Sequence, residues 1–379
     1  MKYNFNKPYI TGNELSLIKK VFENNSFYGS GYFTRKATSK IQKILDAKYV
    51  LLTDSCTSAL EISALLIDKK PHKNEVIMPS YTFSSTANAF LKHGFKVKFV
   101  DIDPANMMIN PSQISKLVNS KTVAVVGVHY GSHLVDSATL KEICKKNKIF
   151  FIEDAAQAFG SKLGGKSAGT FGDFGCFSFH ETKNIHCGMG GAFVTNSKKS
   201  FDKATMIWER GSDRQKLLLG LVDKYTWREI GGSYYPSELQ AAFLCAQLDT
   251  IKENIKKRRQ IYERYASNLK DLIKSKNITF PALQENHTSN YHSFYVFLES
   301  KDKCKRMREY LKACDIQAVT HYVPLHNSPV GKKIFKGKLE NTEKYSNKLL
   351  RLPFHNYLKL KDIDFICERI INFFNSNGK

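Results

Sequence analysis

The chain has 379 residues, and its shares of hydrophobic residues (42%) and charged residues (25%) are close to those of an average soluble globular protein. This composition excludes collagen-like, fibrous and largely disordered proteins, and the length allows one large domain with a second, smaller one. The formal net charge of +23 creates a positive field, which favours small anionic ligands such as a nucleotide diphosphate sugar.

The N-terminal segment, MKYNFNKPYITGNELSLIKK, has no apolar stretch of the length found in a secretory signal peptide. No later window of the sequence is apolar over the length of a membrane span, so we expect a cytoplasmic protein with no membrane partner. The eight cysteines include no Cys-x-x-Cys pair, which indicates reduced thiols and no metal site.

Short apolar runs alternate with helical patterns between residues 49 and 196. Seven of the runs are typical of β-strands: KYVLLT, EVIMPS, KVKFVDI, VAVVGVHY, FFIEDA, CFSFH and GGAFVTN. Segments with helical periodicity lie between several of them, at 57–67, 111–120 and 136–147. The alternation predicts an α/β fold with a mainly parallel sheet, and such sheets bind ligands at the carboxyl ends of their strands.

A long helical pattern at 237–273 follows a polar stretch around 210–235 and is predicted to connect two domains. Its KKRR run at 256–259 has acidic residues nearby, so we interpret the run as the solvated face of a helix. A nucleic-acid partner is therefore not expected, although the net charge alone would allow one.

The C-terminal part again alternates strand-like and helical segments. The runs SFYVFLE and QAVTHYV are predicted strands, and KCKRMREYLKAC and DIDFICERIINFFN are predicted helices. We therefore expect a large domain over 1–250 and a smaller α/β domain over 251–379.

Ser55, Cys56 and Thr57 lie where the first predicted strand ends and a helix begins. The amide groups at a helix N-terminus have no acceptor within the helix, and together with Ser and Thr hydroxyls they can bind a phosphate. Taken alone this pattern is weak, because Ser and Thr are also common helix caps.

Asp154 ends the apolar strand FFIE, and Lys183 follows the strand CFSFH and precedes a glycine-rich turn. A partly desolvated lysine in such a place can form an imine with a carbonyl cofactor, and a carboxylate can keep the ring nitrogen of pyridoxal phosphate protonated. A surface lysine and a helix-capping aspartate are the alternatives. The two residues together with the phosphate cradle favour pyridoxal 5′-phosphate as the cofactor.

Five segments are long and specific enough to carry a family resemblance: VIMPSYTFSSTANAF (76–90), SFHETKN (178–184), VDKYTWREIG (222–231), SELQAAFLCAQL (237–248) and HYVPLH (321–326). With these segments the chain resembles the DegT/DnrJ/EryC1/StrS family of sugar aminotransferases over essentially its whole length. The resemblance implies the aspartate-aminotransferase-like, type I fold of pyridoxal-phosphate enzymes, with a large domain and a smaller C-terminal α/β domain.

The resemblance also implies roles for single residues. Lys183 is implied as the lysine that forms the imine and Asp154 as the partner of the ring nitrogen, in agreement with the chemistry above. Further cofactor contacts are implied for the Phe83 ring on the pyridine face, for Gln157 near the phenolic oxygen, and for Ser178, Cys56 and Thr57 at the phosphate. Core packing is the alternative for Phe83, and His180 is as often structural as functional at such a strand end.

Substrate contacts are implied for five residues, namely Lys224, Tyr225, Arg228, Tyr322 and His326. In the family, the loop at 222–235 reaches the cofactor of a second subunit, so a homodimer with shared active sites is implied. Ordinary solvation of the loop is the alternative for its three residues. Many family members have, at the position of Tyr235, an asparagine that reaches the cofactor phosphate of the neighbouring subunit. Which residue of the loop at 222–235 completes that phosphate site in this chain therefore stays open.

The segments at 222–248 and 322–326 most resemble the members that transfer the amino group of L-glutamate to C4 of dTDP-4-dehydro-6-deoxy-D-glucose. The implied products are dTDP-4-amino-4,6-dideoxy-D-galactose and 2-oxoglutarate. A gluco-forming 4-aminotransferase, a 3-aminotransferase on a related nucleotide keto sugar and a non-catalytic cofactor-binding regulatory protein are the alternatives. A dehydratase on the same fold is disfavoured, because those relatives have histidine in place of the lysine.

Overall fold

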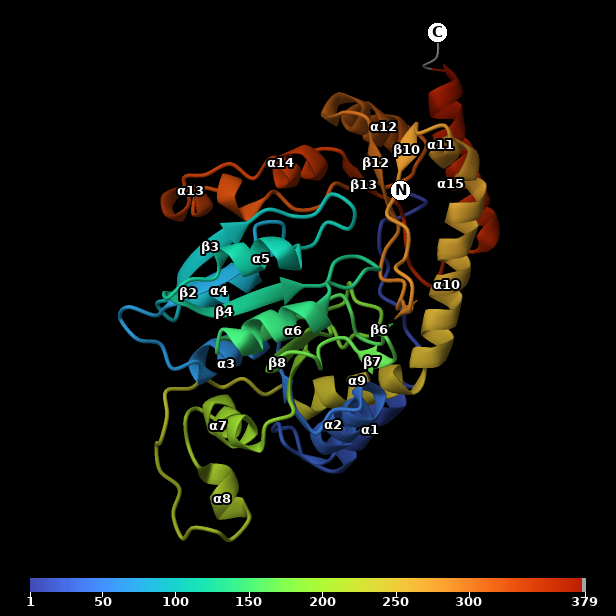
Figure 1. Cartoon of the computed structure of the whole chain (residues 1–379). Helices are drawn as coiled ribbons and strands as arrows, with labels where there is room; N and C mark the ends of the chain where they lie inside the picture. Colours follow the sequence, from blue (N-terminus) through green and yellow to red (C-terminus); the bar gives the residue numbers. More distant parts are fainter. Residues whose placement is uncertain (377–379) are drawn as a thin grey trace.

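The computed structural model, shown in Figure 1, describes residues 1–376. Its centre is a seven-stranded sheet with the strand order β1-β9-β8-β5-β4-β2-β3. The strands are β1 (Tyr49–Thr53), β2 (Glu75–Pro79), β3 (Lys96–Val100), β4 (Thr122–Val128), β5 (Phe150–Asp154), β8 (Phe174–Ser178) and β9 (Gly191–Thr195). All seven predicted strands are confirmed. The sheet is mainly parallel, because β9 alone runs in the direction opposite to that of the other six strands.

Helices cover both faces of the sheet and exclude water from it (Figure 1). One face packs against α3 (Cys56–Leu66), α4 (Ser84–Leu91) and α7 (Lys198–Trp208). The other face packs against α5 (Pro111–Leu117), α6 (Ser137–Lys146), α1 (Glu14–Glu23), α2 (Tyr32–Leu45) and α9 (Glu238–Asp249). The helices predicted at 57–67, 111–120 and 136–147 are confirmed as α3, α5 and α6.

The predicted continuous helix over 237–273 is wrong in one respect, because the structure divides it. α9 ends before Thr250, whose ψ of 12° departs from the helical value, and α10 (Ile251–Asn268) and α11 (Lys270–Lys274) follow. The interpretation of the run at 256–259 also needs correction. Three of its side chains are exposed, but Arg258 is buried and donates to the carbonyl oxygens of Tyr291 and His292.

The C-terminal part has its own core around a three-stranded sheet of β10 (Ile278–Thr279), β12 (Tyr295–Leu298) and β13 (Leu349–Arg351). The predicted helices are confirmed as α12 (Lys301–Ala313) and α15 (Leu360–Ser376). Shorter elements are β6 (Lys162–Leu163), β7 (Lys166–Ser167), α8 (Arg214–Leu218), β11 (His287–Thr288), η1 (Leu325–Asn327), α13 (Gly331–Ile334) and α14 (Glu340–Ser346).

The strand predicted at 317–323 is wrong. Within this segment the structure has a single bridge, between Val319 and Arg351. Tyr322 has a φ of 38°, in the left-handed region, which turns the chain out of an extended conformation. The division of the chain into two domains near residue 250 stays a prediction. The N-terminal residue Tyr3 packs in the core of the C-terminal part, far from it in sequence.

The buried carboxylate of Glu153 holds the end of β5 in place. It has no exposed surface and accepts hydrogen bonds from the backbone amides of Gly169, Phe171 and Gly172, at 3.1, 2.7 and 2.7 Å. The side chains of His129 (3.1 Å) and Ser137 (2.8 Å) also donate to it. Burial alone would raise the pKa of Glu153, but these hydrogen bonds outweigh it and hold the pKa below its ordinary value.

We expect Glu153→Gln to lower the free energy of unfolding at neutral pH by about 3 kcal/mol, because an amide nitrogen would then face backbone donors. A carboxyl with a lowered folded-state pKa contributes stability that is present above its unfolded pKa and is lost as the pH falls through the folded pKa. The variant should therefore also lose less stability on acidification below about pH 4.5 than the wild type.

Urea titrations between pH 3.5 and pH 7 measure both effects. Glu142→Gln, at an exposed position of α6, is the matched control and should follow the wild type. A Glu153→Gln protein with wild-type stability at pH 7 would contradict the assigned role.

Candidate active site

A cavity of about 640 Å³ lies at the carboxyl ends of β4, β5 and β8. Its walls come from distant parts of the chain: the N-terminal segment, the starts of α3 and α4, the three strand ends, and residues of the C-terminal part. Eight of the residues predicted from the sequence line it, namely Cys56, Thr57, Phe83, Asp154, Gln157, Ser178, Lys183 and Tyr322. The predicted strand-end site and the cavity are therefore the same place.

Asp154 lies at the end of β5 with its side chain on the opposite face of the sheet from Glu153. It is 5% exposed, and its Oδ2 accepts a hydrogen bond of 2.7 Å from the hydroxyl of Thr86 on α4. Oδ1 accepts a longer bond of 3.2 Å from the amide of Ala156. Burial raises the pKa of Asp154, and a cationic N–H placed in the cavity beside the carboxylate would reverse this effect.

Lys183 lies in the turn after β8, where its backbone amide donates to the carbonyl oxygen of His180 at 2.8 Å. The side chain is partly buried and lines the cavity. Burial lowers the pKa of Lys183, Cys56 and Asp154 oppose this effect, and Arg351 adds to it. Lowering the pKa increases the share of neutral amine, the form that attacks a carbonyl carbon.

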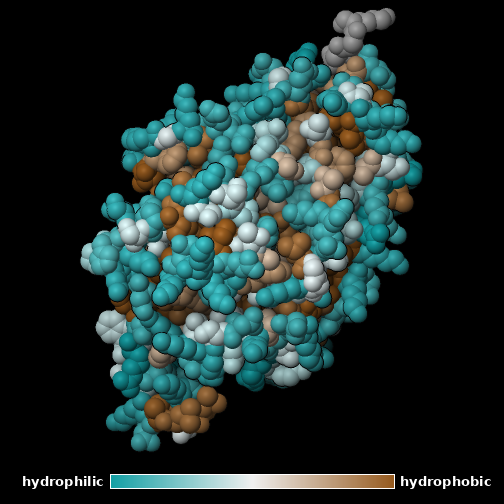
Figure 2. Space-filling view, in the orientation of Figure 1, coloured by the Kyte–Doolittle hydropathy of each residue, from teal (hydrophilic) through white to brown (hydrophobic). Residues whose placement is uncertain are grey.

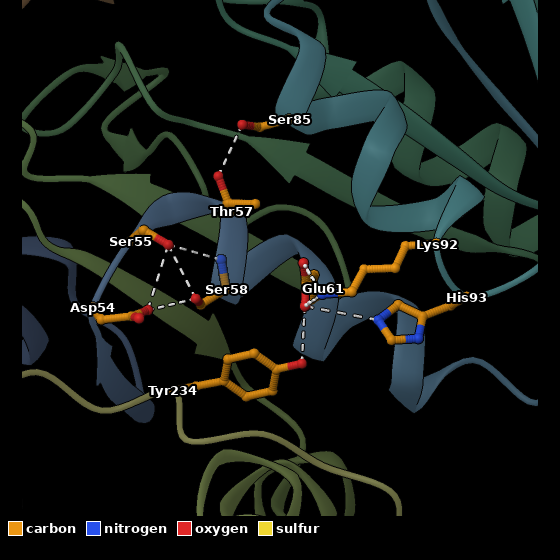
Figure 3. Close-up of polar contacts among 9 residues, drawn as sticks. All are labelled: Asp54, Ser55, Thr57, Ser58, Glu61, Ser85, Lys92, His93 and Tyr234. Carbon is orange, nitrogen blue, oxygen red and sulfur yellow. Dashed lines mark hydrogen bonds and ion pairs between the residues drawn. The ribbon is translucent and has the colours of Figure 1, made fainter. Parts of the chain in front are cut away.

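A cradle of hydrogen-bond donors, some of which Figure 3 shows, lines one part of the cavity. Ser55 caps α3 by accepting from the amide of Ser58 at 3.1 Å, which leaves the amides of Cys56 and Thr57 without an acceptor in the helix. The hydroxyls of Thr57 and Ser85 point toward one another from α3 and α4, 2.8 Å apart. Two helix N-termini and two hydroxyls at one point suit a phosphate group.

Gly191 lets the start of β9 pass directly against this cradle. A Cβ atom built on Gly191 would lie 2.4 Å from the carbonyl carbon of Ser55 and 2.5 Å from the amide nitrogen of Cys56. Any side chain there would push the backbone of the α3 N-terminus away. Gly191, at the end of the glycine-rich turn after Lys183, therefore sets the shape of the phosphate cradle.

Phe83 and Gln157 both line the cavity. Phe83 is the residue before α4, and it lines the cavity although the residue as a whole is 58% exposed. The Gln157 side chain is fixed, because its Oε1 accepts from the amide of Gly131 at 2.7 Å and its Nε2 donates to the Tyr322 hydroxyl at 3.1 Å. The donors, the carboxylate, the amine and the exposed ring together fit pyridoxal 5′-phosphate.

Four predicted substrate residues lie outside the cavity. His326 is buried and bonded to the Ser80 hydroxyl at 2.6 Å and to Glu343 at 3.1 Å, so the structure does not bring it to the cavity, and its role as a substrate contact stays a prediction. Lys224, Tyr225 and Arg228 lie on the loop after α8 and do not reach the cavity of their own chain. Arg228 instead forms an ion pair of 2.8 Å with Asp213.

Several residues of the cavity wall were not predicted from the sequence, namely Thr86, His129, His292, His321 and Arg351. Thr86 gave no signal, because a threonine on a helix face has no distinctive pattern. Arg351 did give one, since it is a charge inside the apolar run LLRLPF. His180, whose role the sequence left open, also lines the cavity, with its Nδ1 3.0 Å from the hydroxyl of Thr182.

No helix within residues 1–376 combines the length and the apolarity needed to cross a membrane. In the same part of the chain, no three His, Cys, Asp or Glu side chains are grouped as a metal ion would require.

The chain is similar to known proteins over nearly its full length. The model of the DegT/DnrJ/EryC1/StrS aminotransferase family matches residues 8–371. A dTDP-4-dehydro-2,3,6-trideoxy-D-glucose 4-aminotransferase from Saccharopolyspora spinosa is 27% identical over 96% of this chain and 95% of its own. A UDP-2-acetamido-2-deoxy-3-oxo-D-glucuronate aminotransferase from Pseudomonas aeruginosa is 29% identical over 88% of both. The structure also superposes on the crystal structure of the aminotransferase TlmJ from Streptoalloteichus hindustanus with a TM-score of 0.91. The two sequences are 25% identical, and the match covers 100% of both chains.

Proposed function

This chain belongs to the DegT/DnrJ/EryC1/StrS aminotransferase family, whose cofactor is pyridoxal 5′-phosphate, and we propose that it aminates a nucleotide-linked keto sugar at C4. The proposed substrates are L-glutamate and dTDP-4-dehydro-6-deoxy-D-glucose, and the products are 2-oxoglutarate and dTDP-4-amino-4,6-dideoxy-D-galactose. One observation carries the proposal: Lys183, Asp154 and the donor cradle of α3 line a single cavity.

In the proposed mechanism Lys183 holds the cofactor and then moves protons. The bound cofactor supplies a ring that takes up the electrons left on a carbon after its proton is removed. The Lys183 amine takes the proton from Cα of the donor, because burial lowers its pKa toward the range of a general base. In the second half of the reaction the same amine delivers a proton to C4 of the sugar.

Asp154 serves both halves by holding a proton on the ring nitrogen. Its carboxylate is positioned by the Thr86 hydroxyl and the Ala156 amide, so that little of its orientation has to change during the reaction. Phe83 and the cradle at Cys56 and Thr57 keep the ring and its phosphate in place, and Gln157 orients the ring edge.

The choice of C4 and of the dTDP nucleotide rests on the segments named above and on the relative that acts at C4 of a dTDP sugar. The main competing assignment is a UDP sugar with its keto group at C3, which is the kind of substrate named for the relative from Pseudomonas aeruginosa. Incubating the protein with dTDP and UDP keto sugars, each bearing its carbonyl at C3 or C4, distinguishes them by the mass of the aminated product.

We further propose a homodimer in which each subunit completes the site of the other. The extension formed by α8 and the following loop projects from the body of the subunit (Figure 1). Figure 2 shows apolar side chains at its tip, and the exposed apolar residues of the extension are Leu218, Leu219, Leu221, Tyr225, Trp227 and Ile230. Such a surface favours a partner subunit over water.

The chain just after the extension is hydrogen-bonded to α3, as Figure 3 shows. The Tyr234 hydroxyl donates to Glu61 on α3 at 2.9 Å, and Lys92 binds the same carboxylate at 3.1 Å. The partly buried Tyr235 adds a bond of 2.6 Å to Tyr28. A firmly anchored extension would carry Lys224, Tyr225 and Arg228 to a partner's cavity in a fixed orientation.

Borohydride reduction of the cofactor-loaded protein should fix the mass of the cofactor to the peptide that contains Lys183, because reduction turns a labile carbon–nitrogen double bond into a stable amine. Peptide mass spectrometry measures this. Lys183→Ala should lose the label and at least on the order of 10³-fold in turnover, whereas Lys166→Arg at an exposed position should retain both. A label on another lysine would overturn the assignment.

Mixing Lys183→Ala subunits with Arg228→Ala subunits should restore part of the activity, because the hybrid dimer has one cavity with an intact lysine and an intact partner loop. Turnover of the mixture relative to each parent measures it. Two differently tagged wild-type preparations establish that subunits exchange. If exchange occurs and the mixture stays as inactive as its parents, the sites are not shared.

The sugar product should be the galacto isomer, in which the new amine at C4 is axial. Lys183 delivers its proton to one face of the sugar only, so one isomer should form. In the galacto isomer H4 is equatorial and its coupling to H3 is small, which proton NMR measures. A large coupling would assign the gluco isomer and leave the aminotransferase reaction itself intact.

A further inference from the structure

His292 is a histidine of the cavity wall whose two ring nitrogens have different surroundings. It lies shortly before β12 and is 6% exposed. Its Nδ1 is hydrogen-bonded to Oδ1 of Asn184 at 3.0 Å. Its Nε2 has no hydrogen-bond partner within residues 1–376, and it is still accessible from outside the protein. Because His292 lines the cavity, we infer that Nε2 is open to the cavity.

The hydrogen bonds of Asn184 determine which nitrogen of His292 carries the proton. The amide nitrogen Nδ2 of Asn184 donates to the carbonyl oxygen of Asn290 at 2.6 Å, so the amide oxygen Oδ1 is the atom that faces His292. An amide oxygen only accepts, and Nδ1 of His292 therefore carries a proton and donates it. Burial, and then the charges of Lys183 and Arg351, hold the pKa of His292 well below its ordinary value, so the ring has one proton only. Nε2 is therefore an acceptor with a free lone pair.

The other histidines that line the cavity do not offer such a fixed acceptor. His129 uses both of its ring nitrogens in hydrogen bonds to buried groups. His180 accepts from a backbone amide through Nδ1, so the proton of its neutral ring is on Nε2. His321 is hydrogen-bonded through Nδ1 to a tyrosine hydroxyl, which can donate or accept and therefore fixes neither tautomer. His292 is thus the imidazole whose lone pair in the cavity is set by the protein itself.

A buried polar network holds His292 in a fixed position relative to Lys183. Asn184, which orients the imidazole, is the residue directly after Lys183 in the sequence, and its backbone carbonyl oxygen accepts from Asn254 of α10 at 2.7 Å. The carbonyl oxygen of His292 accepts from Arg258 of the same helix, also at 2.7 Å. Among the charged groups, Lys183 lowers the pKa of His292 most, as a near neighbour would. The free lone pair of Nε2 therefore lies close to the amine of Lys183.

An acceptor that a bound ligand shuts off from water needs a donor on that ligand. The carboxylates of glutamate and the phosphate of the cofactor only accept, and the cofactor's ring nitrogen is assigned to Asp154. The keto sugar, in contrast, brings hydroxyl groups. Of the two ring carbons bonded to C4 of the proposed sugar, C5 carries a methyl group and C3 carries a hydroxyl.

We propose, on the basis of the function proposed above, that Nε2 of His292 accepts a hydrogen bond from the hydroxyl on the carbon next to the keto carbon, which is C3 in the proposed substrate. Lys183 acts at C4, so a group held beside its amine is closer to the substituents of C3 than to those of C2. A sugar without this hydroxyl would leave Nε2 cut off from water and without a donor. His292 thereby selects keto sugars that carry the hydroxyl against their deoxy counterparts.

The test uses the cofactor-loaded protein with L-glutamate and compares the 6-deoxy, 2,6-dideoxy and 2,3,6-trideoxy forms of dTDP-4-dehydroglucose. The last two sugars differ only in the hydroxyl at C3, and kcat/KM of the wild type should fall between them on the order of 10-fold. The first two differ only in the hydroxyl at C2, and kcat/KM should change much less between them.

Two substitutions separate the roles of the two ring nitrogens. The amide nitrogen of His292→Asn can take the place of Nδ1, so this variant keeps the hydrogen bond to Asn184 but has no acceptor in the cavity. It should lose most of the preference for the C3 hydroxyl. The longer side chain of His292→Gln can place its amide oxygen near the position of Nε2 and should retain more of the preference. His72→Asn, at an exposed position, is the control and should keep the wild-type preference.

The reaction with glutamate alone, followed by the absorbance of the cofactor, distinguishes a contact with the sugar from an effect on Lys183. No sugar hydroxyl takes part in this half of the reaction, so His292→Asn should slow it far less than it slows amination of the 2,6-dideoxy sugar. Equal losses in both halves would assign His292 to Lys183 and overturn the proposal. An Asn variant that keeps the full wild-type preference at C3 would overturn it as well.

The proposed substrate can fail separately from the role of His292. A wild type that aminates a UDP sugar with its keto group at C3, and none of the three dTDP sugars, would refute the proposed substrate. The hydroxyl next to the keto carbon is then the one at C4. The same comparison, made between that sugar and its 4-deoxy counterpart, then supports or overturns the contact with His292.

Discussion

The buried carboxylate of Glu153 is the interaction on which the site depends. Its five donors come from the segment before β8, from the residue after β4 and from the start of α6, so one side chain connects three neighbouring segments. Successive side chains of a strand point to opposite faces, and fixing Glu153 on one face therefore fixes Asp154 on the other. Of these two adjacent residues of β5, Glu153 therefore fixes the structure, and Asp154 faces the cavity.

The two parts of the chain contribute different kinds of groups to the cavity. The central sheet and its helices contribute backbone amides, small hydroxyls and one carboxylate, which suit a cofactor that stays bound. The C-terminal part contributes Arg351, Tyr322 and three rings or imidazoles, which suit a group that comes and goes. Movement of the C-terminal part relative to the sheet would change substrate access while leaving the cofactor contacts of Cys56 and Thr57 intact.

Much of the fold and the chemical centre could be predicted from the sequence, because both depend on local patterns. The apolar runs gave all seven strands of the central sheet, and a strand end followed by a polar residue gave Asp154 and Lys183. The errors have long-range causes. Tyr322 turns the chain out of the predicted strand with a φ of 38°, and its hydroxyl accepts a hydrogen bond from the distant Gln157. His326 is bonded to Ser80 and Glu343 and does not line the cavity. Contacts between residues far apart in sequence also bring Thr86 and Arg351 to the site. The periodicity of apolar residues predicts helices and strands, but it does not predict such long-range contacts.

The close approach of Gly191 to the α3 N-terminus limits how this protein can change over evolution. Most crowded positions in a core tolerate a larger residue once a neighbouring side chain becomes smaller. Here the atoms in the way are the backbone carbon of Ser55 and the backbone nitrogen of Cys56, which every amino acid possesses. No second substitution can make room for a side chain at Gly191. The substrate-facing wall of the cavity can therefore diverge in evolution, whereas this position has to stay glycine.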